Sequence, residues 1–503
     1  MALDGDLRRL AVESFNEHTL AGLAVGLVRD GRLSWFAGLG VADAESGREV
    51  DEQTVFRIGS ISKTMTALAV MQLVEEGSVG LDDPVNEHLR SFRVSHPDRS
   101  SEPVRIRHLL THTGGLGELR RWSDLVRPTI GLAAKPGRVP ELSRYYAPEL
   151  RAEIPPGTKW AYANHGFAAL GQLIEDVTGD PFAVRLRERV FEPLGMQGTD
   201  FLRSERVRDR LAVGYKLGRR GLRAVKDLEI AVPPAGSVFS SVADMALYAA
   251  AIAGGGANGH GRVIREETLA SMLTPAWPSD GLPAMGLAFM LEELDGHRVA
   301  GHDGGWPGFV SALLVAPDDG VGVVAFTNTS TAFAPHDVAE RVLCRMLGTR
   351  APEEREPVPE SPHLWPQLVG LYKLPRGPNT NFRLLPVTAG EIEVAIRGGK
   401  LVARSPSPLT ALRRGVPLRA SDASDPLAFG AEVGGVEFSV VFERGASGRV
   451  EAVRAGSTRG EFVRFVRRPR GTSVRLWGIA AATAVGSVAL GTVVRKVDRR
   501  REG

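Results

Sequence analysis

The sequence is poor in cysteine, and this shortage narrows the kinds of protein that it can encode. Cys344 is the single cysteine among 503 residues. One thiol cannot form an internal disulfide, and it excludes a zinc site built from several cysteines. The first residues also lack a basic stretch followed by an apolar run, so no secretory signal is visible. The single cysteine therefore excludes a disulfide-stabilised scaffold. Because no secretory signal is visible, we expect by default that the body of the protein is cytoplasmic.

Most of the chain also lacks an excess of charge of either sign. The net charge is +3, but residues 464–503 alone carry a net +8, so the other 463 residues carry −5. The body therefore has none of the basic excess that nucleic-acid binding requires. With 43% apolar and 24% charged residues, the chain can build a large core. A disordered, collagen-like or coiled-coil protein is excluded, and the length favours more than one domain.

The longest uncharged run of the sequence lies in the C-terminal tail. Residues 476–494 hold no charged side chain, and their 19 positions approach the ~20 that a helix needs to cross a bilayer. Ser487 and Gly491 have the spacing of small residues in packed membrane helices. Basic clusters on both sides suit anionic head groups but leave the orientation open. We predict a single transmembrane helix over 476–494 and a membrane-associated protein; an apolar helix docked on the protein is the alternative.

Hydrophobic patterning predicts a first domain of α+β type over residues 1–350. Two strands flank Asp30-Gly31, a strong hairpin signal, and a second hairpin is expected over residues 309–328. Helices are expected over three stretches with apolar residues at helical spacing, residues 60–76, 166–177 and 336–347. Early strands, a helical middle and late strands predict that both ends of this domain pair in one sheet.

A second domain follows a stretch rich in proline and glutamate. This stretch, residues 351–362, is typical of a stiff linker. Beyond it, over residues 363–468, short apolar runs recur roughly every 8–12 residues, which is the spacing of a small sandwich or barrel. The expected strands are residues 382–385, 392–396, 401–403, 436–442 and 450–453. We therefore predict a small all-β domain.

Ser60 and Lys63 are the first residues in the chain that could carry chemistry. They form an S-x-x-K pattern, and a serine at the start of a helix is often only an N-cap. Here a helix with an apolar face follows, so Lys63 lies one turn from Ser60 on the same face. The helix start also offers backbone N–H groups to an anion that forms there. A neutral lysine in this place could take the proton of the serine.

Two further short patterns could contribute to a site. Tyr162 and Asn164 stand at i and i+2 in an extended segment and therefore point to the same side. A phenol near a lysine can act as a base, and an asparagine amide can donate to a substrate carbonyl. His302–Gly305, with the sequence H-D-G-G, ends in a glycine pair that lets a substrate approach the backbone. Taken singly, each pattern is better explained without a function, by a packed tyrosine and a turn asparagine in the first and by a loop histidine in the second.

Together, the order and spacing of Ser60, Tyr162 and His302 resemble the serine β-lactamase and penicillin-binding-protein superfamily, in which S-x-x-K carries the nucleophile. The chain most resembles the class C-like branch, where Y-x-N is the second motif and which includes esterases, D-aminopeptidases and D,D-carboxypeptidase-like enzymes. The match extends through L-L-T-H-T-G-G-L at 109–116 and G-H-D-G-G-W-P-G-F at 301–309, and it covers roughly residues 10–347. The stretch that opens at Leu368 is similar to the lipocalin-like barrel often appended to such hydrolases.

The resemblance implies a fold and a role for each motif residue. The fold is an antiparallel sheet with a helical subdomain, followed by the barrel. Ser60 would be the nucleophile, Lys63 its proton acceptor and Tyr162 a partner of Lys63 in proton transfer. Contacts to the substrate and its oxyanion are expected from Asn164, His302, Gly304 and Gly305. The implied activity is hydrolysis of a small ester or of a D-aminoacyl or peptide amide through an acyl-enzyme, with no cofactor, metal or nucleic-acid partner.

The third motif departs from the pattern of the superfamily. It reads H-D-G at His302, where β-lactamases and transpeptidases usually have Lys-Thr/Ser-Gly. A histidine is charged only part of the time near neutral pH, so it binds the carboxylate of penicillins and cephalosporins less well. We therefore expect an esterase or peptidase, with a weak β-lactamase as the alternative. A smaller departure is Gly114, where relatives often carry serine.

An alternative from another functional class is a membrane-tethered sensor or scaffold that acylates without turnover. A protein that had lost its catalysis would be expected to lack at least one of the motif residues, and all four are present: Ser60, Lys63, Tyr162 and Asn164. The sequence therefore favours an enzyme.

Two other motifs carry little weight. Gly254-x-Gly256-x-x-Gly259 matches a dinucleotide-binding pattern, but it follows a helical run rather than a strand, which indicates a surface loop. His108 and His112 have the spacing of a metal-binding helix. No H-E-x-x-H accompanies them, and the resemblance places them in a turn near the active site.

Overall fold

The computed structural model describes residues 2–473, except residues 97, 99–101, 220, 278–282, 332–333, 351–356, 434–435 and 458–460. The chain divides into two compact units after Glu356, and residues 457–461 join the first unit. The predicted transmembrane stretch 476–494 and the first half of the predicted linker lie outside the described residues. Among the helices in the described ranges, none has both the length and the apolar character that a bilayer crossing needs.

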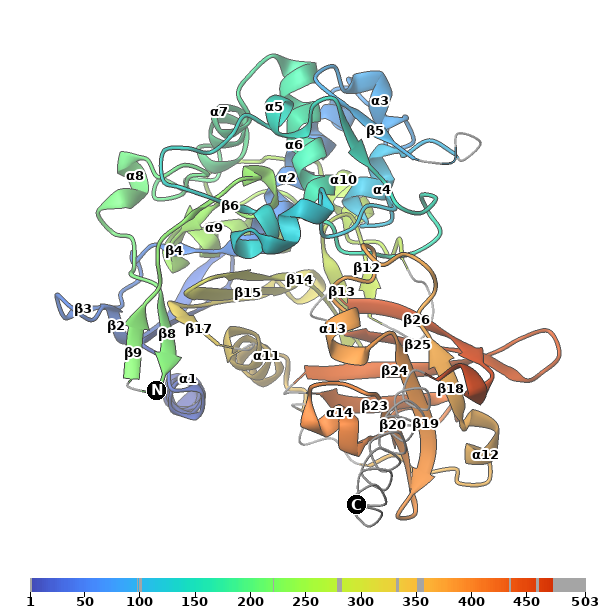
Figure 1. Cartoon of the computed structure of the whole chain (residues 1–503). Coiled ribbons are helices and arrows are strands. Elements are labelled where there is room, and N and C mark those ends of the chain that lie inside the picture. The colour runs from blue at the N-terminus through green and yellow to red at the C-terminus, as the bar shows by residue number, and fades with distance from the viewer. Residues whose placement is uncertain are drawn as a thin grey trace, which may run out of the picture. The chain divides into compact units, whose positions relative to one another are not determined.

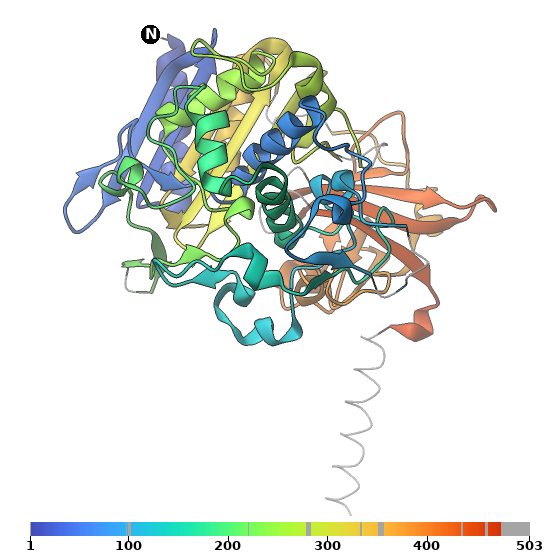
Figure 2. The same ribbon diagram turned by 90° about the horizontal axis from the view of Figure 1, so that it is seen from above.

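The first unit is built on an eight-stranded antiparallel sheet, seen from two sides in Figures 1 and 2. In spatial order the strands are β12 (Ala284–Met285), β13 (Met290–Leu294), β14 (His297–Trp306), β15 (Phe309–Ala316), β16 (Val321–Thr327), β1 (Gly22–Arg29), β2 (Arg32–Asp43) and β3 (Arg48–Glu49). Strand β1 pairs with β16, with Leu23 opposite Thr327. The prediction that both ends of this domain meet in one sheet is confirmed.

Turn residues explain why the two predicted hairpins form. Asp30 and Gly31 join β1 to β2, and both have positive φ, 54° and 72°. This is the backbone that a two-residue hairpin turn requires and that an Asp-Gly pair adopts readily. Between β15 and β16, the chain turns through Pro317–Asp319 and ends the turn at Gly320, whose φ is 66°. Both hairpins are confirmed.

Helices cover both faces of the sheet (Figure 1). On one face lie α2 (Ser62–Glu75) and α9 (Val242–Ala253), and on the other lie α1 (Ala2–His18) and α11 (Ala334–Leu347). Because β1 is covered on both sides, each of its residues except Arg29 is buried. Helix α2 is also buried along most of its length, and a short turn, η1 (Gly59–Ile61), leads into it.

The remaining elements of the first unit form the helical subdomain and several short sheets. The helices are α3 (Val85–His88), α4 (Ile106–Leu110), α5 (Leu142–Tyr146), α6 (Asn164–Thr178), α7 (Phe182–Leu186), α8 (Glu205–Arg208) and α10 (Glu266–Met272). The short strands are β4 (Phe56–Arg57), β5 (Arg93–Ser95), β6 (Ala133–Ala134), β7 (Glu149–Arg151), β8 (Tyr215–Gly218), β9 (Gly221–Ala224), β10 (Glu229–Ile230), β11 (Phe239–Ser240) and β17 (Thr329–Ser330). Helix α6 ends at Gly179, as expected, because this glycine adopts the left-handed conformation.

The second unit is a nine-stranded, nearly closed barrel. Its strands follow the order β21 (Val416–Pro417), β20 (Lys400–Arg404), β19 (Glu391–Arg397), β18 (Gly370–Lys373), β26 (Glu461–Arg468), β25 (Val450–Ser457), β24 (Val436–Arg444), β23 (Ala428–Val433) and β22 (Arg419–Ala420). The two edge strands, β21 and β22, are neighbours in the sequence, so the sheet curls back towards its own start. Tyr372, Phe429 and Phe442 pack in its core.

One strand predicted in this unit is wrong. Residues 382–384 form a turn, and α13 (Leu385–Thr388) follows where a strand was expected. Pro386 explains the difference, because proline lacks the N–H that a strand ladder needs but is well tolerated in the first turn of a helix. The other short helices of this unit are α12 (Trp365–Leu368) and α14 (Thr410–Arg414).

Candidate active site

Ser60 and Lys63 lie side by side at the start of α2. Ser60 occupies η1, and Lys63 follows in the first turn of α2 with a fully buried side chain. The Nζ atom of Lys63 donates to the Oγ atom of Ser60 over 3.0 Å. The one-turn spacing of the S-x-x-K pattern therefore places a hydroxyl and an amine in direct contact, an arrangement in which the amine could activate the hydroxyl.

Two carbonyl oxygens also accept hydrogen bonds from the Lys63 amine. Nζ donates to Oδ1 of Asn164 over 2.8 Å and to the backbone carbonyl of Ala235 over 2.6 Å. The same nitrogen lies 4.8 Å from the centroid of the Tyr162 ring. Nζ of Lys63 thus lies within hydrogen-bonding distance of three oxygens. Ala235 is a contact that sequence reasoning missed, because a backbone carbonyl leaves no mark on the residue type.

The turn after α4 holds the segment that carries Tyr162. The ring of His112 stacks on that of Tyr162, with 4.3 Å between the centroids. Nδ1 of His112 accepts from the backbone N–H of Ala163, and the carbonyl of His112 accepts from the N–H of Ala161. His112 therefore positions the Tyr162 segment from both sides. The resemblance had placed this histidine near the site without giving it a role.

A buried carboxylate, Glu118, extends the polar group beyond Asn164. Nδ2 of Asn164 donates to Oε1 of Glu118 over 2.9 Å, and Glu118 is only 5% exposed. Because Oδ1 of Asn164 faces Lys63 while Nδ2 faces Glu118, the orientation of the amide is fixed by its two neighbours. Sequence reasoning missed Glu118, although it follows two residues after the L-T-H-T-G-G-L stretch.

A neutral, buried histidine, His165, forms a hydrogen bond with the backbone of Glu118. Nε2 of His165 lies 3.1 Å from the backbone carbonyl of Glu118, and its Nδ1 lies 2.7 Å from the hydroxyl of Tyr146. A carbonyl can only accept, so Nε2 carries the proton and Nδ1 accepts from the tyrosine. Complete burial lowers the pKa of His165 to about 4, which keeps the ring neutral near pH 7.

Glycines let strand β14 press against the turn that holds Ser60. A Cβ atom added to Gly304 would lie 2.0 Å from the carbonyl oxygen of Ile58, and one added to Gly59 would lie 2.6 Å from the nitrogen of Gly305. Gly59 also has a φ of 51°. By contrast, a Cβ added to Gly305 would meet nothing within 4 Å. The backbone nitrogen of Gly305 thus lies beside the Ser60 turn, and the position that its Cβ would take faces open space.

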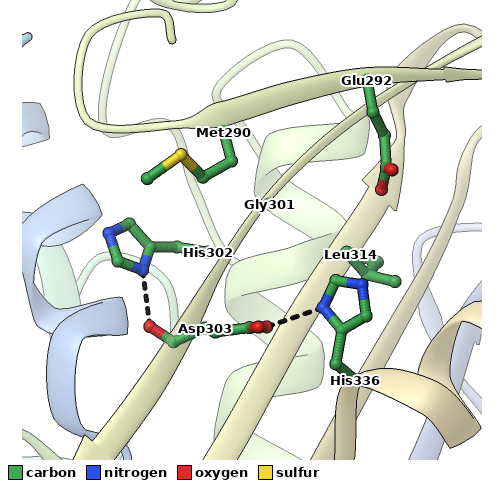
Figure 3. Close-up of a pocket in the computed structure, with 7 residues that line it drawn as sticks. All are labelled: Met290, Glu292, Gly301, His302, Asp303, Leu314 and His336. Carbon is green, nitrogen blue, oxygen red and sulfur yellow. Dashed lines mark hydrogen bonds and ion pairs between the residues drawn. The ribbon is translucent and has the colours of Figure 1, made fainter. Parts of the chain in front are cut away.

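His302 lies on the same strand and is almost completely buried. Its Nδ1 is 2.5 Å from the backbone carbonyl of Asp303, so in the neutral ring Nδ1 carries the proton and Nε2 is an acceptor. The carboxylate of Asp303 is turned away from His302 and pairs with Nδ1 of His336 on α11 over 2.9 Å (Figure 3). A small cavity borders all three side chains, with Met290 and Glu292 of β13 also in its wall.

A cluster of four charged residues anchors the chain that leads to Ala235. Arg57, which is fully buried, pairs with Asp227 over 2.8 Å and with Glu229 over 3.3 Å. Arg203 contacts the same two carboxylates. Asp227 and Glu229 lie only a few residues before the Ala235 carbonyl, so the cluster ties that segment to β4 just ahead of Ser60. No sequence pattern marked these four residues.

The structure brings together every residue singled out from the sequence. Ser60, Lys63, Tyr162 and Asn164 are linked through the Lys63 amine, and His302, Gly304 and Gly305 lie on the strand beside them. The centroids of the Tyr162 and His302 rings are 6.4 Å apart. Within the part of the chain that the structure describes, no group of three histidine, cysteine or acidic residues is arranged to hold a metal ion.

The chain is similar to known proteins over most of its length. Residues 7–343 match the Beta-lactamase family model. Penicillin-binding protein 4 of Amycolatopsis lactamdurans is 30% identical over 365 residues, which span 68% of this chain and 90% of that protein. Esterase EstB of Burkholderia gladioli is 34% identical over 227 residues, 44% of this chain, and the match spans 57% of the esterase.

A solved structure has a similar fold over both units. The penicillin-binding protein homologue from Pyrococcus abyssi is 24% identical, with a TM-score of 0.59, and the match covers 92% of this chain and 99% of that one. The family model covers all residues of the candidate site from Ser60 to Gly305, and the S-x-x-K, Y-x-N and H-D-G motifs lie close together within the matched range. The chain therefore belongs to the Beta-lactamase family and is a serine hydrolase of that family.

Proposed function

We propose that this protein hydrolyses a small ester, or the amide of a D-amino acid or short peptide, through an acyl-enzyme at Ser60. The contact between Nζ of Lys63 and Oγ of Ser60 over 3.0 Å carries the proposal. The similarity to an esterase supports the ester alternative. The H-D-G third motif argues against an efficient β-lactamase, because His302 does not supply a permanent positive charge for the carboxylate of a β-lactam.

The surroundings of Lys63 favour its action as a base on Ser60. A neutral amine has two N–H donors and one lone pair. The carbonyl of Ala235 and the Oδ1 atom of Asn164 can only accept, so they take the two N–H groups. The lone pair can then receive the proton of Ser60, whose Oγ atom lies 3.0 Å from Nζ. The buried amine is thus oriented by two fixed acceptors before a substrate arrives.

The chemical steps follow from this orientation. Oγ of Ser60 bonds to the substrate carbonyl carbon while its proton passes to Nζ of Lys63. The backbone N–H groups of Ser60 and Gly305 stabilise the resulting oxyanion. The bond to the leaving alcohol or amine then breaks, and that group takes the proton from Lys63 with help from the hydroxyl of Tyr162. Water repeats the sequence on the acyl-enzyme and releases the acid.

Intact-mass analysis after incubation with a fluorophosphonate tests the nucleophile. The wild-type chain should gain the mass of one phosphonyl group, and Ser60→Ala should lose both that gain and all turnover. A matched control is Ser62→Ala, since Ser62 is two residues away but its hydroxyl bonds the carbonyl of Gly59 inside the fold. Labelling of Ser60→Ala would overturn the assignment.

A substrate panel tests the chemical class. We expect turnover of p-nitrophenyl esters or D-aminoacyl anilides to exceed that of a chromogenic cephalosporin at pH 7–8. His302→Lys should improve the binding of anionic β-lactams, because it restores a full positive charge near their carboxylate. Efficient hydrolysis of the cephalosporin by the wild type would contradict this order.

We also propose that residues 476–494 attach the protein to a membrane. Their length, their lack of charge and the basic residues on both sides support this. The full chain should then stay in the membrane fraction after carbonate extraction, and a chain that ends at Pro469 should be released and keep its esterase activity. Extraction of the full chain by carbonate would contradict the anchor.

A further inference from the structure

The part of β14 that carries the H-D-G motif extends beyond its pairing with β13. That pairing ends where Met290 lies opposite Gly301, whereas the pairing with β15 continues to Trp306. Residues 302–306 are therefore joined to β15 but lie past the last pair with β13. If the backbone N–H of Gly305 is to keep a fixed position beside the Ser60 turn, this part of the strand benefits from a further restraint.

His336 on α11 forms such a restraint. Its Nδ1 atom lies 2.9 Å from Oδ1 of Asp303. A carboxylate can only accept, so Nδ1 of His336 carries a proton and donates, whether the ring is neutral or charged. Successive side chains of a strand point to opposite faces, so Asp303 faces α11 while His302 faces Tyr162. Figure 3 shows Asp303 between the two histidines, with its carboxylate towards His336 and its backbone carbonyl towards His302.

The stability of the protein does not by itself account for this pair. The side chains of His336 and Asp303 are 3% and 17% exposed, and most of the buried residues on this side of the sheet are apolar. Taking such a pair out of water is costly, and apolar side chains of similar size often stabilise a protein equally well or better. A hydrogen bond differs from apolar packing because it is directional. The pair therefore fixes the position of β14 relative to α11.

We propose that His336 is a positioning residue for the reaction, because through Asp303 it holds the backbone N–H of Gly305 in place for the oxyanion. This inference rests on the proposed function, which assigns Gly305 as an oxyanion donor. Asp303 is two residues from Gly305, and Gly304 between them packs against the Ser60 turn. A shift of Asp303 therefore moves the donor relative to the nucleophile. Since the donor acts on charge that develops in the transition state, its displacement should lower kcat and leave KM almost unchanged.

A double variant separates positioning from stability. Asp303→Val/His336→Leu replaces the pair by apolar side chains, and the adjoining cavity gives them room. We expect its midpoint of urea denaturation to equal or exceed that of the wild type. With p-nitrophenyl butyrate as the substrate, kcat should fall by about 10- to 100-fold, less than or equal to the loss of a whole oxyanion donor, with KM within about twofold. A pair that is merely structural would give the wild-type kcat once stability is restored.

Asp303→Ala is the second variant, for the case in which the double variant does not fold. It removes the acceptor without leaving a buried carboxylate, since His336 can stay neutral, and it should lower kcat by the same factor. His336→Asn is the conservative variant. Its side-chain amide offers an N–H near the position of Nδ1, so it should keep kcat within about threefold of the wild type.

A second histidine–carboxylate pair on α11 supplies the matched control. Nε2 of His18 lies 3.6 Å from Oδ2 of Asp337, and this pair joins α11 to α1 instead of β14. His18→Leu should therefore leave kcat within about twofold of the wild type. A wild-type kcat in the folded double variant, or in folded Asp303→Ala, would overturn the positioning role. So would an equal loss of kcat in His18→Leu, because the effect would then not be specific to β14.

Inhibition by phenylboronic acid measures the same effect without turnover. Boron bonds to Oγ of Ser60 and becomes tetrahedral, so one of its oxygens takes the place of the oxyanion. The Ki should rise in the double variant by about the factor by which kcat falls, and an unchanged Ki would overturn the displacement of the donor. The proposed function fails by a separate sign, namely that the wild type neither hydrolyses p-nitrophenyl butyrate nor is labelled at Ser60 by a fluorophosphonate.

Discussion

The two sides of the main sheet differ in the kind of residue that they bury. Towards α1 and α11 the buried residues are mostly apolar, such as Val299, Leu314 and Leu343, and the buried polar ones include Ser14 and His336. The side that carries α2 buries Lys63 and, in the subdomain above it, Glu118 and other charged groups. Strand β14 contributes residues to both sides of the sheet. Gly304 packs against the turn that holds Ser60, and Asp303 pairs with His336 of α11. Both sides bury an apolar cluster, but the residues of the candidate site gather on the side of α2, so substitutions on the two sides should have different effects.

The largest effect is expected from Gly304→Val on the side of α2. The new Cβ would lie 2.0 Å from the carbonyl oxygen of Ile58 and 2.3 Å from Oγ of Ser311, so β14 and the Ser60 turn must move apart. Misplacing the nucleophile and the oxyanion donor together should lower kcat/KM by roughly 10³-fold. Gly305→Ala is the matched comparison and should cost far less, because its Cβ meets nothing within 4 Å. Equal losses would contradict the close approach.

Leu343→Ala, on the side of α11, should lower the stability of the protein and leave kcat almost unchanged. Leu343 is fully buried between α11 and the sheet. Its truncation leaves a cavity, and we expect the free energy of unfolding to fall by about 2–5 kcal/mol. Since no catalytic residue touches this side chain, kcat at 25 °C should stay within about twofold of the wild type. Urea denaturation and ester hydrolysis measure the two quantities. Loss of kcat in a folded variant would show that the sides are coupled.

Tyr162→Phe tests the contribution of a single hydroxyl group on the side of the sheet that carries α2. It keeps the ring that stacks on His112 and lies beside Lys63, and it removes only the hydroxyl. If that hydroxyl moves a proton, kcat should fall by about 10²-fold while stability hardly changes. Tyr145→Phe is the control, because the hydroxyl of Tyr145 bonds the carbonyl of Gly131 outside the catalytic group. A full kcat in Tyr162→Phe would remove the phenol from the mechanism.

The smallest expected effect is the change in the free energy of unfolding with pH. His165 is neutral in the folded protein because its pKa is about 4, whereas an unfolded histidine takes up a proton below about 6.5. The unfolded state therefore binds more protons as the pH falls, and the free energy of unfolding should drop by about 2 kcal/mol from pH 7 to pH 5 on this account alone. His165→Gln should flatten this part of the stability curve. An unchanged curve would contradict a buried neutral histidine.

Local patterns in the sequence were enough to predict much of the fold. The hairpin at Asp30-Gly31 and the end of α6 at Gly179 depend on backbone conformations that few residues other than glycine adopt, so these signals were reliable. The S-x-x-K spacing was enough to place Ser60 beside Lys63, because one helical turn fixes their separation. The strand expected over residues 382–385 failed because a short apolar run fits a turn or a helix equally well.

The parts of the site that escaped prediction come from contacts between distant segments. The Ala235 carbonyl reaches Lys63 across 172 positions of sequence, and a backbone oxygen has no signature in the residue type. Glu118 and Arg57 look like ordinary charged residues until the fold buries them. Residues that act through position rather than through a motif can be identified only from the folded chain.

The pairing of β1 with β16 also governs when the protein can begin to work during its synthesis. Leu23 can pair with Thr327 only after residue 327 has been synthesised. The turn that holds Ser60 likewise packs against Gly304 and Gly305, which also come late in the sequence. Contacts over such distances form late and slowly. A nascent chain that still lacks β14 to β16 therefore holds its serine and lysine without the strand that completes the site. Translation must pass residue 327 before the ribosome-bound chain can become an enzyme.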